Sequence, residues 1–380
     1  MFPHQDFTMN NKSQKKLSIL ILNWRDIKHP LAGGAEISTH EHAKGWVRAG
    51  HTVTIFSSSF QDAKTREEID GVRIIRKGSH YTVHLHAFIY YLTKLRGKID
   101  LVIDEFHFIP FFSPLYIKKK KIAFIHETAE ELWFKNNPFP INILGYRLEP
   151  LFFKLYKNMT FITVSKSTKK GLLKFGIKEN NIVIVQNGVQ KVVNKFEKEE
   201  NPVIIYLGRL AKDKGVEDAI EAFSYLAKRA AKIKFWVVGK EEKKDYKKYL
   251  KKKAKDLKIE QKMIFFDYIS DEKKFELLKK AWMIINPSIK EGWGLTVIEG
   301  ASQGTPTVAY KTVGLSDSII DGKTGLLVSL RKPEGLADKI LFLLKHRTLY
   351  HRISQNAVEW SKSFSWDKSV KKSLELIKNI

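Results

Sequence analysis

EGWGLTVIEGASQGTPTVAY, residues 291–310, is the segment that most constrains the fold of this chain. Its glycines Gly292 and Gly294 predict a tight turn, and the apolar residues that follow predict a short helix. TPTVAY (305–310) then predicts a buried strand. A turn and helix set between two strands are typical of α/β folds, in which ligands bind at the carboxyl ends of the strands.

Two carboxylates accompany this turn and helix. Glu291 stands on the turn, and Glu299 lies inside the helix. Leu295 and Thr296 open the helix, so their amides would favour a bound anion, while the carboxylates would accept hydrogen bonds from hydroxyl groups. This combination suits a ligand with phosphates and many hydroxyls, such as a nucleotide-sugar. A solvated glutamate at a helix start with an incidental second one would explain the same spacing.

Length and composition limit the class of protein. The 380 residues suggest two domains, and 43% hydrophobic residues indicate a globular chain. The absence of cysteine excludes disulfides, thiolate zinc sites and cysteine nucleophiles, and it fits a reducing cytoplasm. No segment has the roughly 18 uninterrupted apolar residues of a membrane span. Residues 1–16 lack the apolar core of a signal peptide, and we expect them to form a loose tail.

The net charge of +26 is spread over the whole chain. Residues 1–190 carry 28 Lys and Arg against 16 Asp and Glu, and the remainder carries 39 against 25. Nucleic acid, an anionic membrane surface or a phosphorylated ligand would each explain such an excess. A lysine-rich proteome would explain it without any partner.

Strands and helices alternate along the chain, which predicts an α/β fold with parallel sheets. The polar, proline-terminated stretch 191–202 reads as a linker between two such series. We therefore expect one domain over 1–190 and a second over 191–365, with an amphipathic helix over 366–380. The expected strands are 17–22, 51–57, 71–76, 99–104, 121–126, 160–165 and 181–186, then 202–209, 234–239, 263–269, 281–288, 305–310 and 325–328.

Further candidate site residues follow expected strands. Gly33 and Gly34 open a helix and would let backbone amides approach a phosphate or sugar, although a tight turn explains them equally. Arg209 and Lys214 suit a diphosphate, although surface charge is the alternative. His126 ends a strand and would orient a sugar hydroxyl or share a proton, unless it is structural.

The histidines show no metal-ligand spacing, and the sequence contains no Asp-x-Asp triplet. Many glycosyltransferases of another fold use that triplet to hold a divalent metal. We therefore expect no metal and no other cofactor, with cations and helix amides stabilising the leaving group.

Six motifs in order resemble the retaining nucleotide-sugar glycosyltransferases of family 4 (group 1), whose GT-B fold consists of two facing Rossmann-like domains. The resemblance covers nearly the whole chain. The motifs are GGAE with a later GHTVT (33–36, 50–54), TVSKST (163–168), VQNGV (185–189), GRLAKDKG (208–215), EGWGLTVIEGASQGTPTVA (291–309) and DGKTGLLV (321–328).

The resemblance implies a role for each matching residue. Glu291 would face the donor sugar, Glu299 the ribose, and Arg209 with Lys214 the diphosphate. His126 would lie beside the transferred sugar. The two glycines of GGAE would approach the diphosphate and the acceptor.

The resemblance also implies which domain binds which substrate and how transfer proceeds. The first domain, completed by the helix 366–380, would bind the acceptor, and the second would bind a UDP- or GDP-sugar. The family retains anomeric configuration. A front-face substitution, in which the departing phosphate assists the incoming hydroxyl, is the mechanism we expect.

The acceptor is less constrained. The aromatic stretch 106–117 beside Lys118–Lys121 would dock a lipid-linked acceptor or an anionic membrane surface, although a buried segment with a charged end explains it equally. We expect a hydroxyl acceptor in cell-envelope glycan assembly and a cytoplasmic protein peripheral to the membrane. The alternatives are a soluble enzyme that makes a small glycoside or glucan, and a basic nucleic-acid-binding protein. The last lacks any recognition module, so no nucleic-acid partner is expected.

Overall fold

The structure is a computed structural model that describes residues 15–189, 192, 197–267 and 269–379. Most of the tail expected at the start of the chain lies outside these residues. Part of the linker expected over 191–202 also lies outside them.

The first half of the chain forms an eight-stranded sheet in the order β3-β4-β2-β1-β5-β6-β7-β8. All neighbouring strands are parallel except β3 and β4. Helices cover both faces, which is why the central strands read as continuous apolar runs. The strands are β1 (Ser18–Leu22), β2 (Thr52–Ser57), β3 (Arg66–Ile69), β4 (Val72–Arg76), β5 (Leu101–Phe106), β6 (Lys120–Ile125), β7 (Thr160–Thr163) and β8 (Ile182–Ile184).

The second half forms a six-stranded parallel sheet in the order β11-β10-β9-β12-β13-β14. The strand order reverses between β9 and β12, and such a switch point leaves a crevice at the carboxyl ends of the strands. The strands are β9 (Val203–Leu207), β10 (Lys234–Val238), β11 (Met263–Phe266), β12 (Met283–Asn286), β13 (Thr307–Tyr310) and β14 (Gly325–Val328). The expected α/β fold with two largely parallel sheets is confirmed.

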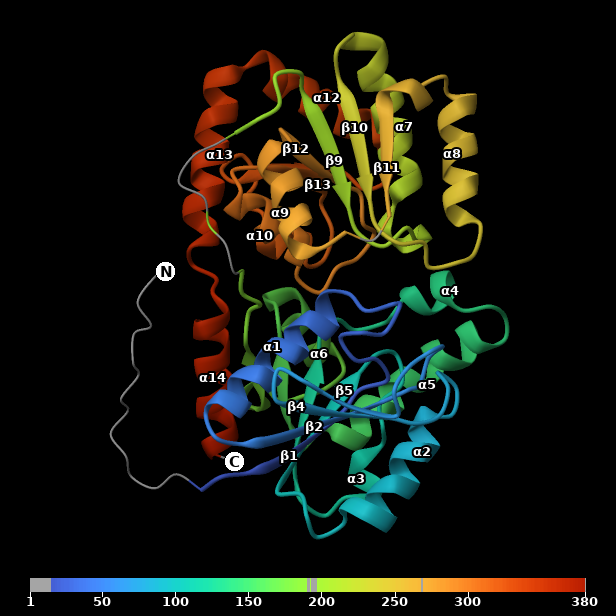
Figure 1. Ribbon diagram of the computed structural model, residues 1–380, viewed down its shortest axis with the longest axis vertical. Helices are drawn as coiled ribbons and strands as arrows, with labels where there is room; N and C mark the ends of the chain where they lie inside the picture. The colour runs from blue at the N-terminus through green and yellow to red at the C-terminus, as the bar shows by residue number, and fades with distance from the viewer. Residues whose placement is uncertain (1–14, 190–191, 193–196, 268, 380) are drawn as a thin grey trace.

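Figure 1 shows the two sheets one above the other with their helices around them. The first-half helices are α1 (Gly34–Arg48), α2 (Val83–Tyr90), the π-helical turn η1 (Tyr91–Leu95), α3 (Ser113–Tyr116), α4 (Leu132–Asn136), α5 (Ile141–Tyr156), α6 (Lys166–Lys174) and η2 (Glu179–Asn181). The helices that come later in the chain, after β9, are η3 (Lys212–Lys214), α7 (Val216–Arg229), α8 (Tyr246–Asp256), η4 (Glu260–Lys262), α9 (Asp271–Lys280), α10 (Leu295–Ser302), α11 (Leu315–Ser318), α12 (Pro333–Lys345), α13 (Arg347–Ser361) and α14 (Trp366–Asn379).

The last helix, α14, returns to the first sheet and packs on α1 (Figure 1). A β-carbon at Gly45 would lie 2.2 Å from Val370 Cγ1, so only glycine lets the two helices approach this closely. His42 Nδ1 and Trp46 Nε1 each lie 3.0 Å from Ser373 Oγ. The end of the chain is therefore an integral part of the first half.

Because His42 is buried between α1 and α14, we predict that acid destabilises the packing of these two helices. Burial lowers the pKa of His42 to about 4, whereas an unfolded histidine titrates near 6.5. Between these values the unfolded chain binds the extra proton, so the free energy of unfolding falls as pH drops through this window. We expect a contribution of about 2 kcal/mol at pH 4.5. Denaturant unfolding between pH 7.5 and 4.5 measures it.

The control for this prediction is His42→Gln, which removes the titrating group. The variant should show a smaller loss of stability over the same pH range, because the other buried histidines still titrate. An identical pH slope in both proteins would contradict the assignment.

Candidate active site

A cleft of about 1020 Å³ lies where the carboxyl ends of the two sheets face each other, and both halves of the chain line it. Loops after β1, β5 and β6 supply one wall, and loops after β9 and β12 supply the other. Every site residue expected from the sequence lines this cleft: Gly33, Gly34, His126, Arg209, Lys214, Glu291, Gly292, Gly294, Leu295, Thr296 and Glu299.

Arg209 and Lys214 enter the cleft from the loop after β9 and are already paired with carboxylates. Lys214 Nζ lies 3.0 Å from Glu291 Oε1, and Arg209 pairs with Glu242. Burial alone would lower the pKa of Lys214, but the neighbouring carboxylates, led by Glu291, raise it above its ordinary value. The ammonium group therefore stays charged inside the cleft.

Gly292 joins the two walls. A β-carbon there would lie 2.3 Å from the carbonyl oxygen of His126, so any side chain would force the loops after β12 and β6 apart. The neighbouring Glu291 is fixed as well, because Ser288 Oγ donates a hydrogen bond of 2.8 Å to its Oε1. The glycine turn thus packs against the first half of the chain, and Ser288 and Lys214 hold the Glu291 carboxylate beside it.

His126 is a buried, neutral histidine that lines the cleft. Burial lowers its pKa to about 3, and the nearby His107 adds to the effect. Its Nε2 has no hydrogen-bond partner among the described residues. A neutral imidazole can orient a hydroxyl group, whereas sharing a proton at neutral pH would need a pKa near 7. Burial therefore favours the first of the two roles expected from the sequence.

Helix α10 begins at the floor of the cleft. Its N-cap, Gly294, has a φ of 82°, in the left-handed region that favours glycine. Leu295 Cβ lies 3.6 Å from where a β-carbon of Gly34 would stand, so the glycine loop after β1 touches the start of this helix.

Glu299 is buried further along α10 and forms an ion pair with Lys274 of α9, with 2.7 Å between Lys274 Nζ and Glu299 Oε1. Burial would lower the pKa of Lys274, but this carboxylate raises it. Lys274 was not foreseen from the sequence. It holds the Glu299 carboxylate at the edge of the cleft.

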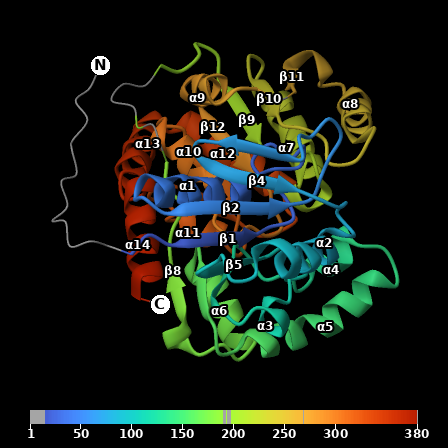
Figure 2. The same ribbon diagram turned by 60° about the horizontal axis from the view of Figure 1, so that its bottom comes forward.

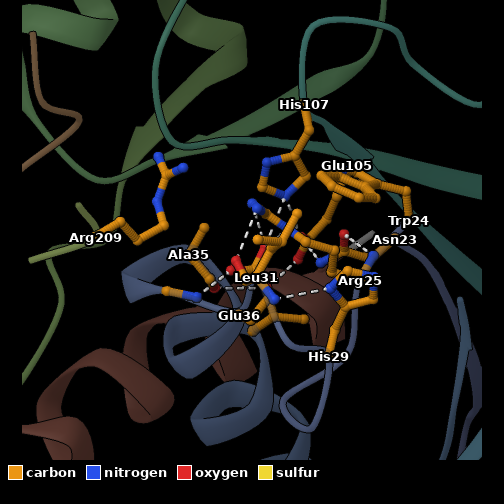
Figure 3. Close-up of polar contacts among 12 residues, drawn as sticks. Asn23, Trp24, Arg25, His29, Leu31, Ala35, Glu36, Glu105, His107 and Arg209 are labelled. Carbon is orange, nitrogen blue, oxygen red and sulfur yellow. Dashed lines mark hydrogen bonds and ion pairs between the residues drawn. The ribbon is translucent and has the colours of Figure 1, made fainter. Parts of the chain in front are cut away.

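Glu36 anchors a second polar cluster, which Figure 3 shows. Its carboxylate lies 2.8 Å from the Arg25 guanidinium, and its Oε2 accepts a hydrogen bond of 2.6 Å from the Gly33 amide. His107 Nε2 lies 3.6 Å from Glu36 Oε1. The sequence placed this glutamate in the GGAE motif without a role. The structure shows that it ties Gly33 to Arg25 within the loop after β1 and to His107 in the loop after β5.

Two charged residues next to expected site residues were also missed. Glu127 follows His126, and its Oε2 has no hydrogen-bond partner within the described part of the chain. Burial raises the pKa of this carboxyl group, and Lys214 opposes the rise. Lys290 precedes Glu291 and crosses to the first half, where its Nζ lies 2.5 Å from Glu130 Oε2. Their positions beside the motif residues were the only signal in the sequence.

Glu149 of α5 holds the loop that carries these groups. Its buried carboxylate accepts hydrogen bonds of 2.8 Å from the amides of Ala129 and Glu130, and Trp133 Nε1 donates a third at 3.1 Å. These three hydrogen bonds hold the loop after β6 in the conformation in which Glu130 pairs with Lys290.

Within the ranges that the structure describes, no group of three or more His, Asp or Glu side chains is arranged to hold a metal ion.

Family comparisons agree with this geometry. Residues 32–191 match the model of Glycosyltransferase Family 4, and residues 190–360 match that of the glycosyl transferases group 1. The two matches meet at the junction of the two sheets and together span most of the chain. This protein is a group 1 glycosyltransferase with the GT-B fold.

Individual relatives support the same class. An uncharacterized glycosyltransferase of Methanocaldococcus jannaschii, MJ1607, is 22% identical over 95% of this chain and 98% of its own length. Mannosylfructose-phosphate synthase of Agrobacterium fabrum is 30% identical but aligns over 53% of this chain and only 46% of its own length. The crystal structure of Anabaena HepE in complex with UDP and glucose has a TM-score of 0.75 at 17% identity, covering 96% of this chain and all of HepE.

The ion pair between Lys290 and Glu130 predicts coupling between the two halves. Lys290→Met and Glu130→Gln should each weaken binding of a nucleoside diphosphate, because Lys290 directly precedes Glu291 on the cleft wall. The double variant should lose less than the sum of the two, with a coupling energy of about 1 kcal/mol or more. Calorimetric titration of the four proteins measures it.

Lys273→Met and Glu276→Gln provide the matched control, because that pair lies exposed on α9 with both partners on one helix. Nucleotide affinity should not change in these variants. Strict additivity in the Lys290 and Glu130 cycle would show that the pair does not join the two walls functionally.

Proposed function

We propose that this protein transfers a hexose from a UDP- or GDP-sugar to a hydroxyl acceptor with retention of anomeric configuration. One observation carries the proposal: a single cleft holds two partly buried cations, a helix start and two carboxylates, which complement the diphosphate and the hydroxyls of a nucleotide-sugar. HepE, which shares the fold, was crystallised with UDP and glucose.

In this proposal the second half binds the donor. The diphosphate lies against Arg209 and Lys214 and takes over part of their pairing with Glu242 and Glu291. The first amides of α10 add to the positive field. Glu299 accepts the ribose hydroxyls, held in place by Lys274.

The transferred sugar lies between the two walls. Glu291 and the neutral His126 face its hydroxyls. The acceptor oxygen attacks the anomeric carbon on the face from which the phosphate leaves: the new C–O bond forms, the sugar–phosphate bond breaks, and the acceptor proton passes to the departing phosphate oxygen. Retention follows because both events occur on one face.

Leaving-group charge is carried by Arg209, Lys214 and helix amides in this mechanism, so no metal or other cofactor is proposed. Preorganised cations in a water-poor cleft stabilise developing charge more strongly than the same groups in water. Closure of the cleft around both substrates limits hydrolysis.

We assign acceptor binding to the first half together with α14. The acceptor we propose is a lipid-linked or cell-envelope glycan precursor, met by a cytoplasmic protein at the inner face of the membrane. No helix among the described residues has both the length and the apolar character that crossing a bilayer requires. The second candidate is a small sugar acceptor, which the name of mannosylfructose-phosphate synthase favours.

A donor panel tests the function. UDP- and GDP-hexoses are incubated with glycerolipid, polyprenyl and small-sugar acceptors, and nucleoside diphosphate release and the anomeric configuration of the product are measured. We expect the sugar to be transferred with retention of its anomeric configuration, and we expect this activity to persist when a chelator is added. An inverted product, or loss of activity in the chelator, would contradict the mechanism.

Nucleotide binding should be lost in Glu299→Ala.

Arg209→Ala and Lys214→Ala should each lower turnover by about 100-fold or more, since one donor to a developing charge is worth several kcal/mol. Initial rates at saturating donor measure the effect. Lys248→Ala is the control, because this lysine is exposed on α8 away from the cleft. Normal turnover in both cleft variants would refute their assigned role.

A further inference from the structure

Helix α2 and the turn η1 expose apolar side chains on the side that faces away from the sheet. Leu85 is 58% exposed and Ile89 48%, while Phe88 and Leu92 are also exposed. These positions recur at i, i+3, i+4 and i+7, which is the spacing of one helix face. The opposite face, with Val83, is buried. The helix therefore carries a second apolar face that is largely exposed.

Helix α5 shows the same arrangement. Leu144 is 59% exposed and Leu151 is 56% exposed, at i and i+7 of one face, while Phe153 on the opposite face is buried. In α3, Leu115 is 70% exposed.

Aromatic contacts join the three helices into one surface. The rings of Phe88 in α2 and Tyr116 in α3 have centroids 5.0 Å apart, and those of Phe112 and Phe152 in α5 are 5.5 Å apart. Figures 1 and 2 both show α2, α3 and α5 gathered on one side of the first half. We call this surface the α2–α3–α5 face, defined by Leu85, Phe88, Ile89, Leu115, Leu144 and Leu151.

The segments that form the α2–α3–α5 face are rich in basic residues. The segments 81–98, 113–121 and 141–157 contain ten Lys and Arg residues against one acid, Glu149, which is buried. The exposed charged residues of these three segments are all basic, and we call them the basic rim: Lys94, Arg96, Lys98, Lys118, Lys119, Lys120, Arg147, Lys154 and Lys157. Exposed apolar side chains together with these basic residues complement an anionic lipid surface.

An apolar groove opens in the same face. Its volume is about 310 Å³, and it is lined by His84, Phe88, Phe111, Phe112, Leu115 and Tyr116. The loop from His107 to Phe112 connects this groove to the cleft, because His107 lines the cleft and Phe112 lines the groove.

The expected docking segment 106–117 contributes less than the sequence suggested. Phe106, Phe111 and Ile117 are buried in the first half, and Lys121 Nζ donates hydrogen bonds to backbone carbonyls. Helices α2 and α5, which the sequence analysis did not single out for docking, supply most of the exposed apolar surface.

We propose that the α2–α3–α5 face docks this protein onto an anionic lipid bilayer. The leucine and phenylalanine side chains enter the acyl boundary, and the lysines of the rim contact the headgroups. A second copy of the chain fits this face poorly, since two cationic rims would repel each other. The inference rests on the proposed function only in naming where a lipid-linked acceptor is met.

Co-sedimentation of the full chain with vesicles tests the proposal. Vesicles of phosphatidylcholine alone are compared with vesicles that also contain phosphatidylglycerol. The unmodified protein should bind the anionic vesicles at least about tenfold more strongly. The triple variant Leu85→Glu, Leu115→Glu and Leu151→Glu should lose this binding. Ile264→Glu, an exposed apolar position of the second half, should retain it.

Two triple variants with the same net charge distinguish the effect of the α2–α3–α5 face on vesicle binding from the effect of the overall charge. Lys118→Ala with Lys119→Ala and Lys120→Ala should weaken vesicle binding, whereas Lys248→Ala with Lys252→Ala and Lys255→Ala on α8 should not. Equal losses in both triples, or no preference for anionic vesicles, would overturn the proposal. So would a leucine variant that only converts a dimer to a monomer in light scattering.

Nucleotide binding is measured on the same preparations. Vesicle binding without nucleotide binding would remove the glycosyl-transfer proposal and leave the docking surface standing. Nucleotide binding without vesicle binding would remove the docking proposal and leave the glycosyl-transfer proposal standing. Retained nucleotide binding in the leucine variant also shows that its fold is intact.

Discussion

The close approach of Gly292 to the carbonyl of His126 is the constraint on which the cleft depends. It brings the loop after β12 against the loop after β6, and it leaves no room for a β-carbon. Lys290 and Glu291 stand beside it, so one reaches the first half and the other turns into the cleft. The identity of a single residue thereby fixes how the two sheets face each other.

Three cations of the cleft are paired with carboxylates before any substrate binds. Lys214, Arg209 and Lys274 each pair with a carboxylate, so the cleft holds concentrated charge at a tolerable desolvation cost. Exchange of these carboxylates for phosphate oxygens then replaces one set of charge-assisted hydrogen bonds with another. Such a site favours anionic ligands without carrying an unpaired buried cation.

Much of the fold was predictable because parallel strands are continuous apolar runs. β14 has the expected bounds, and most other strands differ from expectation by a few residues. β3 was missed because REEI is a charged, antiparallel edge strand. α5 was missed because it contains Gly145 and Pro150 and is apolar on two faces. Residues with a motif signature were found in the cleft, whereas the roles of Glu127, Lys274 and Lys290 depend on contacts between distant segments.

The return of α14 to α1 has a consequence for synthesis. His42 and Trp46 reach their partner Ser373 across more than 300 residues of chain. While the ribosome makes the second half, the surface of α1 around Gly45 stays uncovered. The first half is thus made first but completed late, because its folding ends only after α14 has been synthesised.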